Sequence, residues 1–163
     1  MLWIQAPAVA SLQTLVSRLF QTKLGGYLSL KTTLFGIVGQ STYVKKQTRQ
    51  EQAINEQNRL PFLIIYPFTK TKEWYLVPFE ERKEMMMDHI RLGHAHASIR
   101  QLLLYAFGVD DHEFIVSYET EKLEDFQQLI IDLRATKVRL YTANDLPIFP
   151  CVYGSIEWVM ELV

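Results

Sequence analysis

Apolar side chains along this chain recur at two spacings, which predict strands alternating with helices. Residues 61–69, PFLIIYPFT, form a short uninterrupted apolar run that is typical of a strand buried on both faces. Residues 79–97 carry methionine, isoleucine and leucine at helical spacing, so a long amphipathic helix is expected there. The runs 100–107 and 113–119 flank a Gly-Val-Asp-Asp turn and predict a hairpin. The pattern is completed by a helix at 123–133, an edge strand at 146–153 and a short final helix at 156–162.

The order of these elements is strand, helix, strand, strand, helix, strand, which is the order of a ferredoxin-like unit. Upstream, a strand at 2–5, a helix beginning at Val9 and a strand at 27–38 match the last half of a second such unit. The stretch that joins the two parts is polar and glutamine-rich, as expected of a connection. We therefore expect an α+β protein with a partial N-terminal lobe and connecting loop over residues 1–60 and a C-terminal lobe over residues 61–163.

Composition and charge narrow the classes of function. The formal net charge is −1, but residues 1–60 carry seven Lys and Arg against two acidic residues, so the chain begins basic and continues acidic. This asymmetry fits either packing between lobes or attraction of an anionic ligand. Cys151 is the single cysteine, which excludes an intrachain disulfide and fits a reducing compartment. The sequence has no apolar run near the ~20 residues of a membrane span, no secretory signal pattern and no basic stripe typical of nucleic-acid binding, so a cytoplasmic protein is expected.

His89 is the first candidate for chemistry, because it lies on the inward, methionine-rich side of the predicted helix. A histidine on an apolar helix face is most often a packed core residue, and that alternative stays open. An imidazole also suits iron, and one histidine is enough to hold a haem from one side. A zinc site is not expected, because His89, His94 and His96 cannot all converge from one regular helix.

Four further residues are candidates close to the same strand and helix. Tyr66 ends the buried strand, where its phenol could fill the core, carry a radical beside a redox cofactor or bond a carboxylate. Lys70 could neutralise an anionic group, although a lysine at a strand end is usually solvated. Trp74 could line a planar ligand or pack the start of the helix. Arg59 could bind a carboxylate of a cofactor, with a solvated loop as the alternative.

Three segments together resemble one known family. YPFTKTKEWYLVPFEER, MMMDHIRLGH and FGVDDHEFIVSYET stand in the order and at the distances found in the chlorite dismutase-like superfamily, which includes the coproheme decarboxylases. These motifs fall within residues 61–153, and weaker similarity covers residues 2–30 and Ser41–Tyr43. The resemblance implies ferredoxin-like lobes that form a dimeric α+β barrel, an incomplete N-terminal lobe and assembly into a homo-oligomer.

The resemblance also implies roles for single residues. His89 matches the axial ligand of a haem iron, which places haem b or iron coproporphyrin in the C-terminal lobe. Tyr66 matches the tyrosine whose radical starts propionate oxidation, and Lys70 a lysine that orients a propionate. Trp74 matches a tryptophan of the pocket, and Gln101 a distal glutamine. The implied activity is the oxidative decarboxylation of iron coproporphyrin to haem b, with hydrogen peroxide as the oxidant.

Two departures from the family pattern keep other functions open. A chlorite dismutase needs an arginine over the distal face of the iron, and Gln101 stands near that register here. Arg100 points to the opposite face of its strand, so chlorite conversion is disfavoured. The family sequence Arg-x-Thr-Glu is replaced by Arg134-Ala135-Thr136-Lys137, which puts a lysine in the acidic place. The alternatives are a chlorite-converting or peroxidase-like haem enzyme and a haem-binding protein without catalysis.

Overall fold

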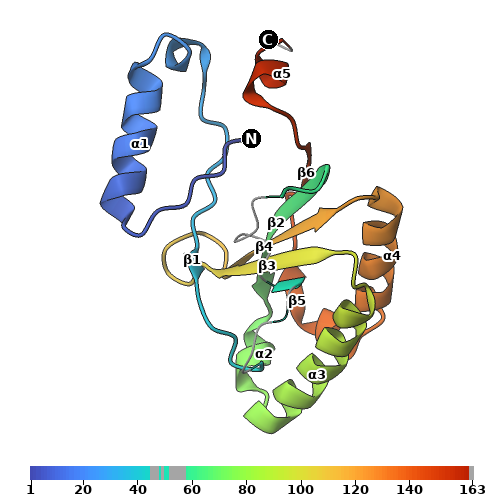
Figure 1. Ribbon diagram of the computed structural model, residues 1–163. Coiled ribbons are helices and arrows are strands. Elements are labelled where there is room, and N and C mark those ends of the chain that lie inside the picture. The colour runs from blue at the N-terminus through green and yellow to red at the C-terminus, as the bar shows by residue number, and fades with distance from the viewer. Residues whose placement is uncertain (45–47, 49, 52–57, 162–163) are drawn as a thin grey trace. The chain divides into compact units, whose positions relative to one another are not determined.

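The computed structural model describes residues 1–44, 48, 50–51 and 58–161, and the chain divides into two compact units, Met1–Thr33 and Leu34–Val163 (Figure 1). The first unit is built around one helix, and the second contains the sheet. This division falls earlier in the chain than the lobe boundary expected at residue 60, which stays a prediction.

The first unit contains α1 (Val9–Gln21) and the 3-10 turn η1 (Gly25–Tyr27). The periodic apolar positions make α1 amphipathic. Thr22 ends the helix, because its backbone N–H and its hydroxyl both donate to the carbonyl of Leu19. Gly25 follows in a position where a Cβ atom would collide with the helix backbone, so the chain can turn there only with glycine.

The second unit is built on an antiparallel sheet. Its strands are β1 (Ile37–Val38), β2 (Phe62–Lys70), β3 (Arg100–Tyr105), β4 (Phe114–Thr120), β5 (Thr142–Asn144) and β6 (Phe149–Val152). The strands follow the order β1-β3-β4-β2-β5, and β6 pairs with another part of β2. The β3–β4 hairpin turns at Gly108, whose φ of 70° lies in the left-handed region that glycine adopts without strain.

Helices connect these strands. They are α2 (Lys72–Leu76), α3 (Phe79–Ala95), α4 (Leu123–Arg134), the 3-10 helix η3 (Lys137–Tyr141) and α5 (Ile156–Glu161). α3 contacts α4 and η3, and α4 also contacts β4 (Figure 1). Glu80 and Glu81 in the first turn of α3 complement its dipole. The sequence of β2, α3, β3, β4, α4 and β6 is therefore that of a ferredoxin-like unit.

The core has separate apolar clusters on the two faces of the sheet. Alternation along each strand directs neighbouring residues to opposite faces. The cluster beside α4 is formed by Ile99, Val116, Tyr118, Leu129 and Leu133. The cluster on the other face is formed by Ile65, Ala106 and Ile115. A third cluster, which joins α2, α3 and η3, is formed by Trp74, Met85 and Val138.

The structure confirms the α+β class and the ferredoxin-like order, but the sheet of the described residues is not closed into a barrel. The strand expected at 2–5 is wrong, and the strand expected at 27–38 is confined to Ile37–Val38. Apolar and β-branched residues without a neighbouring strand have no partner for their backbone groups, so composition alone did not make these segments strands. Residues 45–47, 49 and 52–57 of the expected connection lie outside the described residues.

Candidate functional site

A cavity of about 390 Å³ lies in the second unit between the sheet and α3. This volume falls in the range of roughly 300–1,000 Å³ that is usual for small-molecule and cofactor sites. Strand alternation puts every second residue of three strands on the cavity floor. The floor residues are Tyr66, Phe68 and Lys70 of β2, Gln101, Leu103 and Tyr105 of β3, and Phe114, Val116 and Tyr118 of β4. The side of α3 that faces the cavity contributes Arg82, Met86, His89, Ile90 and Gly93.

His89 lines the cavity as a neutral imidazole. Its Nδ1 lies 3.3 Å from the hydroxyl oxygen of Thr136, and that hydroxyl donates its own proton to the carbonyl of Leu133 at 2.7 Å. Thr136 can therefore only accept from the imidazole, which assigns the proton to Nδ1 and the lone pair to Nε2. Burial, together with the positive charge of Lys70, lowers the pKa of His89 from 6.5 to about 4. This protonation state is the one that a metal requires of a histidine ligand.

Tyr66 lies on the strand side of the cavity, beside the ring of Tyr118. The two ring centroids are 6.1 Å apart, and the ring planes are inclined by 26°. Burial first, and then the neighbouring Tyr118, raise the pKa of Tyr66 well above its usual value of 10. Burial raises the pKa of Tyr118 to about 12. Both side chains are therefore neutral phenols at neutral pH.

Lys70 ends β2 among aromatic and acidic neighbours. Its Nζ lies 4.9 Å from the centroid of the Trp74 ring, which is within the range of a cation–π contact. Its backbone N–H donates to Oε2 of Glu113 at 2.7 Å, and the hydroxyl of Tyr75 donates to the same oxygen at 2.6 Å. Burial, and then the charge of Arg139, lower the pKa of Lys70 to about 8. The ammonium group is still mostly charged at neutral pH.

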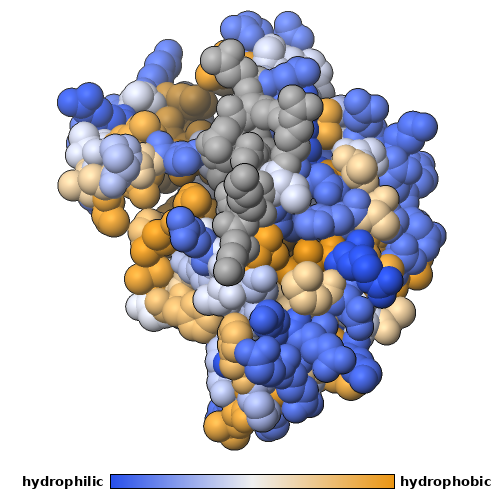
Figure 2. Space-filling model, turned by 60° about the horizontal axis from the view of Figure 1, so that its bottom comes forward, coloured by the Kyte–Doolittle hydropathy of each residue, from blue (hydrophilic) through white to orange (hydrophobic). Residues whose placement is uncertain are grey.

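Basic side chains outnumber acidic ones on the cavity wall of the described residues. The face in Figure 2 shows hydrophobic side chains exposed between hydrophilic ones. Arg82 has a buried Nε that finds no hydrogen-bond acceptor among the described residues, so it is available to a ligand. Arg139 is held by Asp145, whose Oδ2 lies 2.5 Å from its Nη1. The lining includes four basic side chains, those of Lys70, Arg82, Arg134 and Arg139, and two acidic ones, those of Glu51 and Asp145. The cavity is therefore suited to an apolar ligand with anionic groups.

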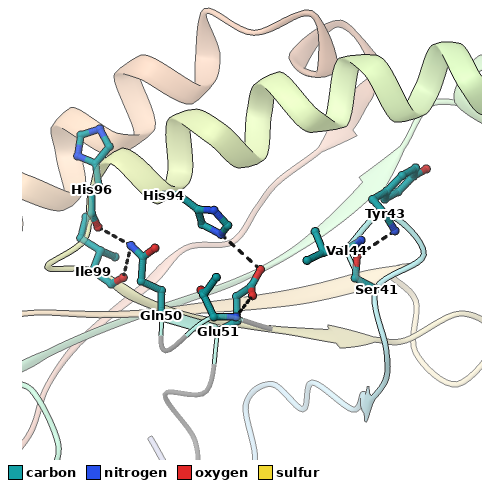
Figure 3. Close-up of polar contacts among 9 residues, drawn as sticks. Ser41, Tyr43, Val44, Gln50, Glu51, His94, His96 and Ile99 are labelled. Carbon is teal, nitrogen blue, oxygen red and sulfur yellow. Dashed lines mark hydrogen bonds and ion pairs between the residues drawn. The ribbon is translucent and has the colours of Figure 1, made fainter. Parts of the chain in front are cut away.

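The segment before β2 is attached to the end of α3 (Figure 3). Nε2 of Gln50 donates to the carbonyls of His96 at 2.8 Å and Ile99 at 3.3 Å. Oε1 of Glu51 lies 3.7 Å from Nε2 of His94, and the two side chains point toward each other. These contacts join this segment to the helix, so they place the wall of the cavity that Glu51 belongs to.

Five of the six residues that the sequence nominates line this cavity: Tyr66, Lys70, Trp74, His89 and Gln101. The sixth, Arg59, is not among the lining residues. Its Nη1 lies 2.9 Å from Oε1 of Glu119, which belongs to the opposite face of β4 from the cavity floor. The structure therefore brings together the candidates from β2, α2, α3 and β3, and it separates Arg59 from them.

Three neighbours of these residues escape sequence reasoning. The sequence drew attention to Lys137, whereas it is Thr136, one position earlier, whose hydroxyl contacts His89. Tyr118 shares the strand parity of other cavity residues, but its contact with Tyr66 depends on the register between β4 and β2. Glu113 was expected to begin the strand at 113–119, and its carboxylate instead accepts from the backbone N–H of Lys70. Parity could have nominated Tyr118, and no comparable signal points to the other two.

Metal binding by protein side chains alone is not supported here. Within the part of the chain that the structure describes, no group of three or more His, Cys, Asp or Glu side chains could hold a metal ion. A metal at His89 would therefore take its other ligands from a bound organic group. In the same part of the chain, no helix combines the length and the apolar character needed to cross a membrane.

Comparison with known proteins decides the family. A family model described as chlorite dismutase matches residues 1–154 of the chain. The chain belongs to the chlorite dismutase family. A doubly substituted variant of the chlorite dismutase from Candidatus Nitrospira defluvii is 26% identical, with a TM-score of 0.85 over 96% of this chain and 69% of that chain. The same enzyme in complex with imidazole is 25% identical, with a TM-score of 0.85 over 96% of this chain and 68% of that chain.

Another relative of this chain is named for a different activity. The coproheme decarboxylase of Mycolicibacterium smegmatis is 34% identical over 96 residues. The match covers 59% of this chain and 42% of that protein, so it spans less than half the length of the relative. The comparisons therefore assign the family, while two named activities occur among the relatives.

Proposed function

We propose that this chain binds an iron porphyrin in the cavity and catalyses the peroxide-dependent oxidative decarboxylation of iron coproporphyrin to haem b. The observation that carries the proposal is the convergence of His89 from α3 with Tyr66 and Lys70 from β2 on one cavity. The similarity to the coproheme decarboxylase of Mycolicibacterium smegmatis supports this choice of substrate. Arg59 has no part in the proposal, because its partner in the structure is Glu119.

The residues around the cavity fit an iron porphyrin. The neutral imidazole of His89 offers Nε2 as an axial ligand, since Nδ1 holds the proton. Phe68 and Phe114, whose ring centroids are 4.7 Å apart, give the floor an apolar surface for a flat macrocycle. The excess of basic side chains suits the carboxylates of the propionate groups. When bound, the iron porphyrin supplies the oxidising power that it draws from peroxide.

Tyr66 and Lys70 perform the remaining steps in this proposal. Tyr66 gives up one electron and one proton, and its radical then removes a hydrogen atom from a propionate. Loss of that hydrogen atom, one further electron and carbon dioxide converts the propionate to a vinyl group, while one hydrogen peroxide is reduced to two waters. Lys70, protonated below its pKa of about 8, holds the propionate carboxylate. Trp74 packs beside the ammonium group of Lys70, and Gln101 offers an amide at the cavity floor.

The first experiment tests binding. Titration of the chain with ferric coproporphyrin is expected to give a Soret band that shows histidine ligation. The His89→Gln variant is expected to lose that signature, because its amide does not replace an imidazole at iron. A His96→Gln variant is the matched control, since the ring of His96 pairs with Asp132 and His96 is not among the residues that line the cavity. Unchanged ligation in His89→Gln would contradict the proposed site.

The second experiment tests turnover. Peroxide is added to the loaded protein, and mass spectrometry follows the stepwise loss of carbon dioxide from the porphyrin. Tyr66→Phe is expected to keep the Soret band and form no haem b, because it retains the ring but not the phenol. Tyr153→Phe, an exposed tyrosine, is the control. Normal conversion by Tyr66→Phe would refute the role of this residue.

Chlorite conversion is the second candidate, because the chlorite dismutase of Candidatus Nitrospira defluvii aligns with 96% of this chain. Arg100, the nearest arginine to Gln101 in sequence, argues against it. Arg100 donates from Nη1 to the carbonyl of Asn58 at 2.6 Å, and the same atom lies 3.5 Å from Glu119. Oxygen evolution from chlorite by the haem-loaded protein, without conversion of iron coproporphyrin, would select this function instead.

A further inference from the structure

Arg82 is a half-buried arginine on the wall of the cavity, and the function proposed above gives it no role of its own. Its Nε is buried and has no hydrogen-bond acceptor among the described residues. Arg134 and Arg139 on the same wall are instead paired with Asp145. A buried donor without an acceptor is destabilising and rare in folded proteins. A ligand in the cavity can supply the acceptor that Arg82 lacks.

Two aromatic rings fix the guanidinium group of Arg82. Its central carbon lies 6.0 Å from the centroid of the Trp74 ring and 5.9 Å from the centroid of the Phe79 ring. Trp74 is 3% exposed, and Phe79 is stacked on Tyr43 with centroids 6.0 Å apart, so both rings are themselves held. Cation–π contacts stabilise the positive charge, but a ring face does not replace a carboxylate as an acceptor of N–H groups. Arg82 is thus held in place with an unused donor.

A second positive group lies beside the same tryptophan. Nζ of Lys70 is 4.9 Å from the centroid of the Trp74 ring, so Lys70 and Arg82 both lie within about 6 Å of one ring centroid. Like charges gathered around a buried ring repel each other, because apolar surroundings screen them poorly. Carboxylate groups that enter the cavity would relieve this repulsion and pair with both cations.

α3 connects this end of the cavity with His89. Arg82 and His89 are separated by seven positions, which is close to two helical turns, so both lie on the side of α3 that lines the cavity. Seven residues advance a helix by about 10 Å. A flat ligand whose centre lies at His89 therefore reaches Arg82 with its rim, and the carboxylates of a porphyrin stand on the rim.

We propose that Arg82 is a ligand-binding residue whose guanidinium group pairs with a carboxylate on the rim of the ligand, while Lys70 pairs with a neighbouring carboxylate. The proposal rests on the function proposed above, because it takes that ligand to be a porphyrin. It adds a subsite and a selectivity, since the Trp74 end of the cavity binds flat ligands that carry two carboxylates there, with or without iron. Arg82 suits this role because its planar group donates two parallel hydrogen bonds to one carboxylate.

The first test needs no ligand, because the proposal makes a prediction about the stability of the free protein. Arg82→Met keeps an unbranched apolar side chain against the two rings and removes the unpaired donor together with its charge. Its midpoint of urea unfolding is expected to stay close to that of the unsubstituted chain or to rise. Arg139→Met is the comparison, and its midpoint should fall because Asp145 loses its closer partner. A fall in Arg82→Met as large as that in Arg139→Met overturns the proposal, since Arg82 would then be satisfied within the fold.

The second test titrates the protein with metal-free coproporphyrin, whose fluorescence reports binding without iron, peroxide or turnover. Arg82→Met is expected to bind this porphyrin about tenfold more weakly than the unsubstituted chain does. Arg82→Lys, which keeps the charge, should recover part of the loss. Lys83→Met is the matched control and should leave the affinity unchanged, because Lys83 is not among the lining residues and its Nζ lies 3.6 Å from Glu80.

The tetramethyl ester of the same porphyrin separates recognition of charge from packing. It has the same ring but no carboxylate, so Arg82→Met and the unsubstituted chain are expected to bind it equally. Equal affinity of the two proteins for the free acid overturns the subsite, as does a failure of the unsubstituted chain to bind metal-free coproporphyrin. An equal loss of affinity for the acid and for the ester overturns it too, because Arg82 would then act by shaping the cavity.

The two proposals fail in different ways. If the unsubstituted chain forms no haem b, the proposed function fails, while the urea and fluorescence measurements still decide the role of Arg82. If haem b forms and Arg82→Met binds metal-free coproporphyrin as tightly as the unsubstituted chain does, the proposed function stands and the subsite is refuted. With iron coproporphyrin and peroxide, Arg82→Met should raise KM more than it lowers kcat, because Arg82 binds the rim and takes no part in the oxidation of Tyr66.

Discussion

The protonation of His89 should make the folded chain unstable in mild acid. The pKa of this residue is lowered from 6.5 to about 4, first because it is buried and second because Lys70 is near. An unfolded chain therefore takes up a proton on His89 at a higher pH than the folded chain does. The contribution of neutral His89 to the free energy of unfolding is fully present above pH 6.5, and it is lost as the pH falls toward about 4.

The expected magnitude follows from these two values. One pH unit corresponds to about 1.4 kcal/mol, so the full difference between 6.5 and about 4 corresponds to about 3.5 kcal/mol. Between about pH 7 and about pH 4.5, His89 alone should lower the free energy of unfolding by about 2.5 kcal/mol. For a domain of ordinary stability, roughly 5–15 kcal/mol, this is a large fraction.

Urea unfolding of the ligand-free chain at the two pH values measures the effect, with the fluorescence of the buried Trp74 as a signal. Carboxylates also titrate in this range, so the comparison is made with His89→Gln, in which they are unchanged. The pH-dependent loss should be smaller in His89→Gln by about 2.5 kcal/mol. If both proteins lose the same stability, His89 is not a buried neutral imidazole, and the argument for its Nε2 as an iron ligand is refuted.

Three other predictions test separate parts of the structure. Lys70→Met should weaken binding of iron coproporphyrin about tenfold, whereas Lys72→Met, in the exposed start of α2, should leave that binding unchanged. The affinity of the unsubstituted chain for iron coproporphyrin should fall as the pH rises through about 8, where Lys70 loses its charge. Gly108→Ala should cost about 1 kcal/mol in urea unfolding because of its φ of 70°, whereas Gly93→Ala, in α3 with open space around it, should stabilise by up to about 1 kcal/mol. Glu119→Gln should lower the free energy of unfolding by about 2 kcal/mol, because the buried carboxylate of Glu119 lies 2.9 Å from the guanidinium group of Arg59 and 3.5 Å from that of Arg100, and both guanidinium groups reach water. An unchanged urea midpoint would contradict this.

The elements of the second unit could be predicted because their apolar periods are strong and their turns carry clear signals. The run at 61–69 became β2, and the methionine-rich period became α3. The segment at 27–38 has a similar β-forming composition, yet only Ile37–Val38 pairs, with β3. Pairing requires a neighbouring strand with exposed backbone groups, and composition contains no information about that neighbour.

The candidate site could be predicted in part for a similar reason. Tyr66, Lys70 and His89 stand in local motifs, so the sequence names them without reference to any distant residue. Thr136 acts on His89 across 47 positions, and Glu113 acts on Lys70 across 43. Such contacts depend on how helices pack and on strand register, neither of which a local pattern reports.

The register between β2 and β4 decides which of their side chains line the cavity. Strand side chains alternate with a period of two, so a shift of β4 by one residue against β2 would turn Tyr118 away from Tyr66. The same shift would turn Glu119 away from Arg59 on the opposite face, and breaking this ion pair of a buried carboxylate is strongly destabilising. The ion pair of Arg59 and Glu119 therefore contributes to the site without lining it. It penalises the wrong register and so holds the phenols of Tyr66 and Tyr118 on one face.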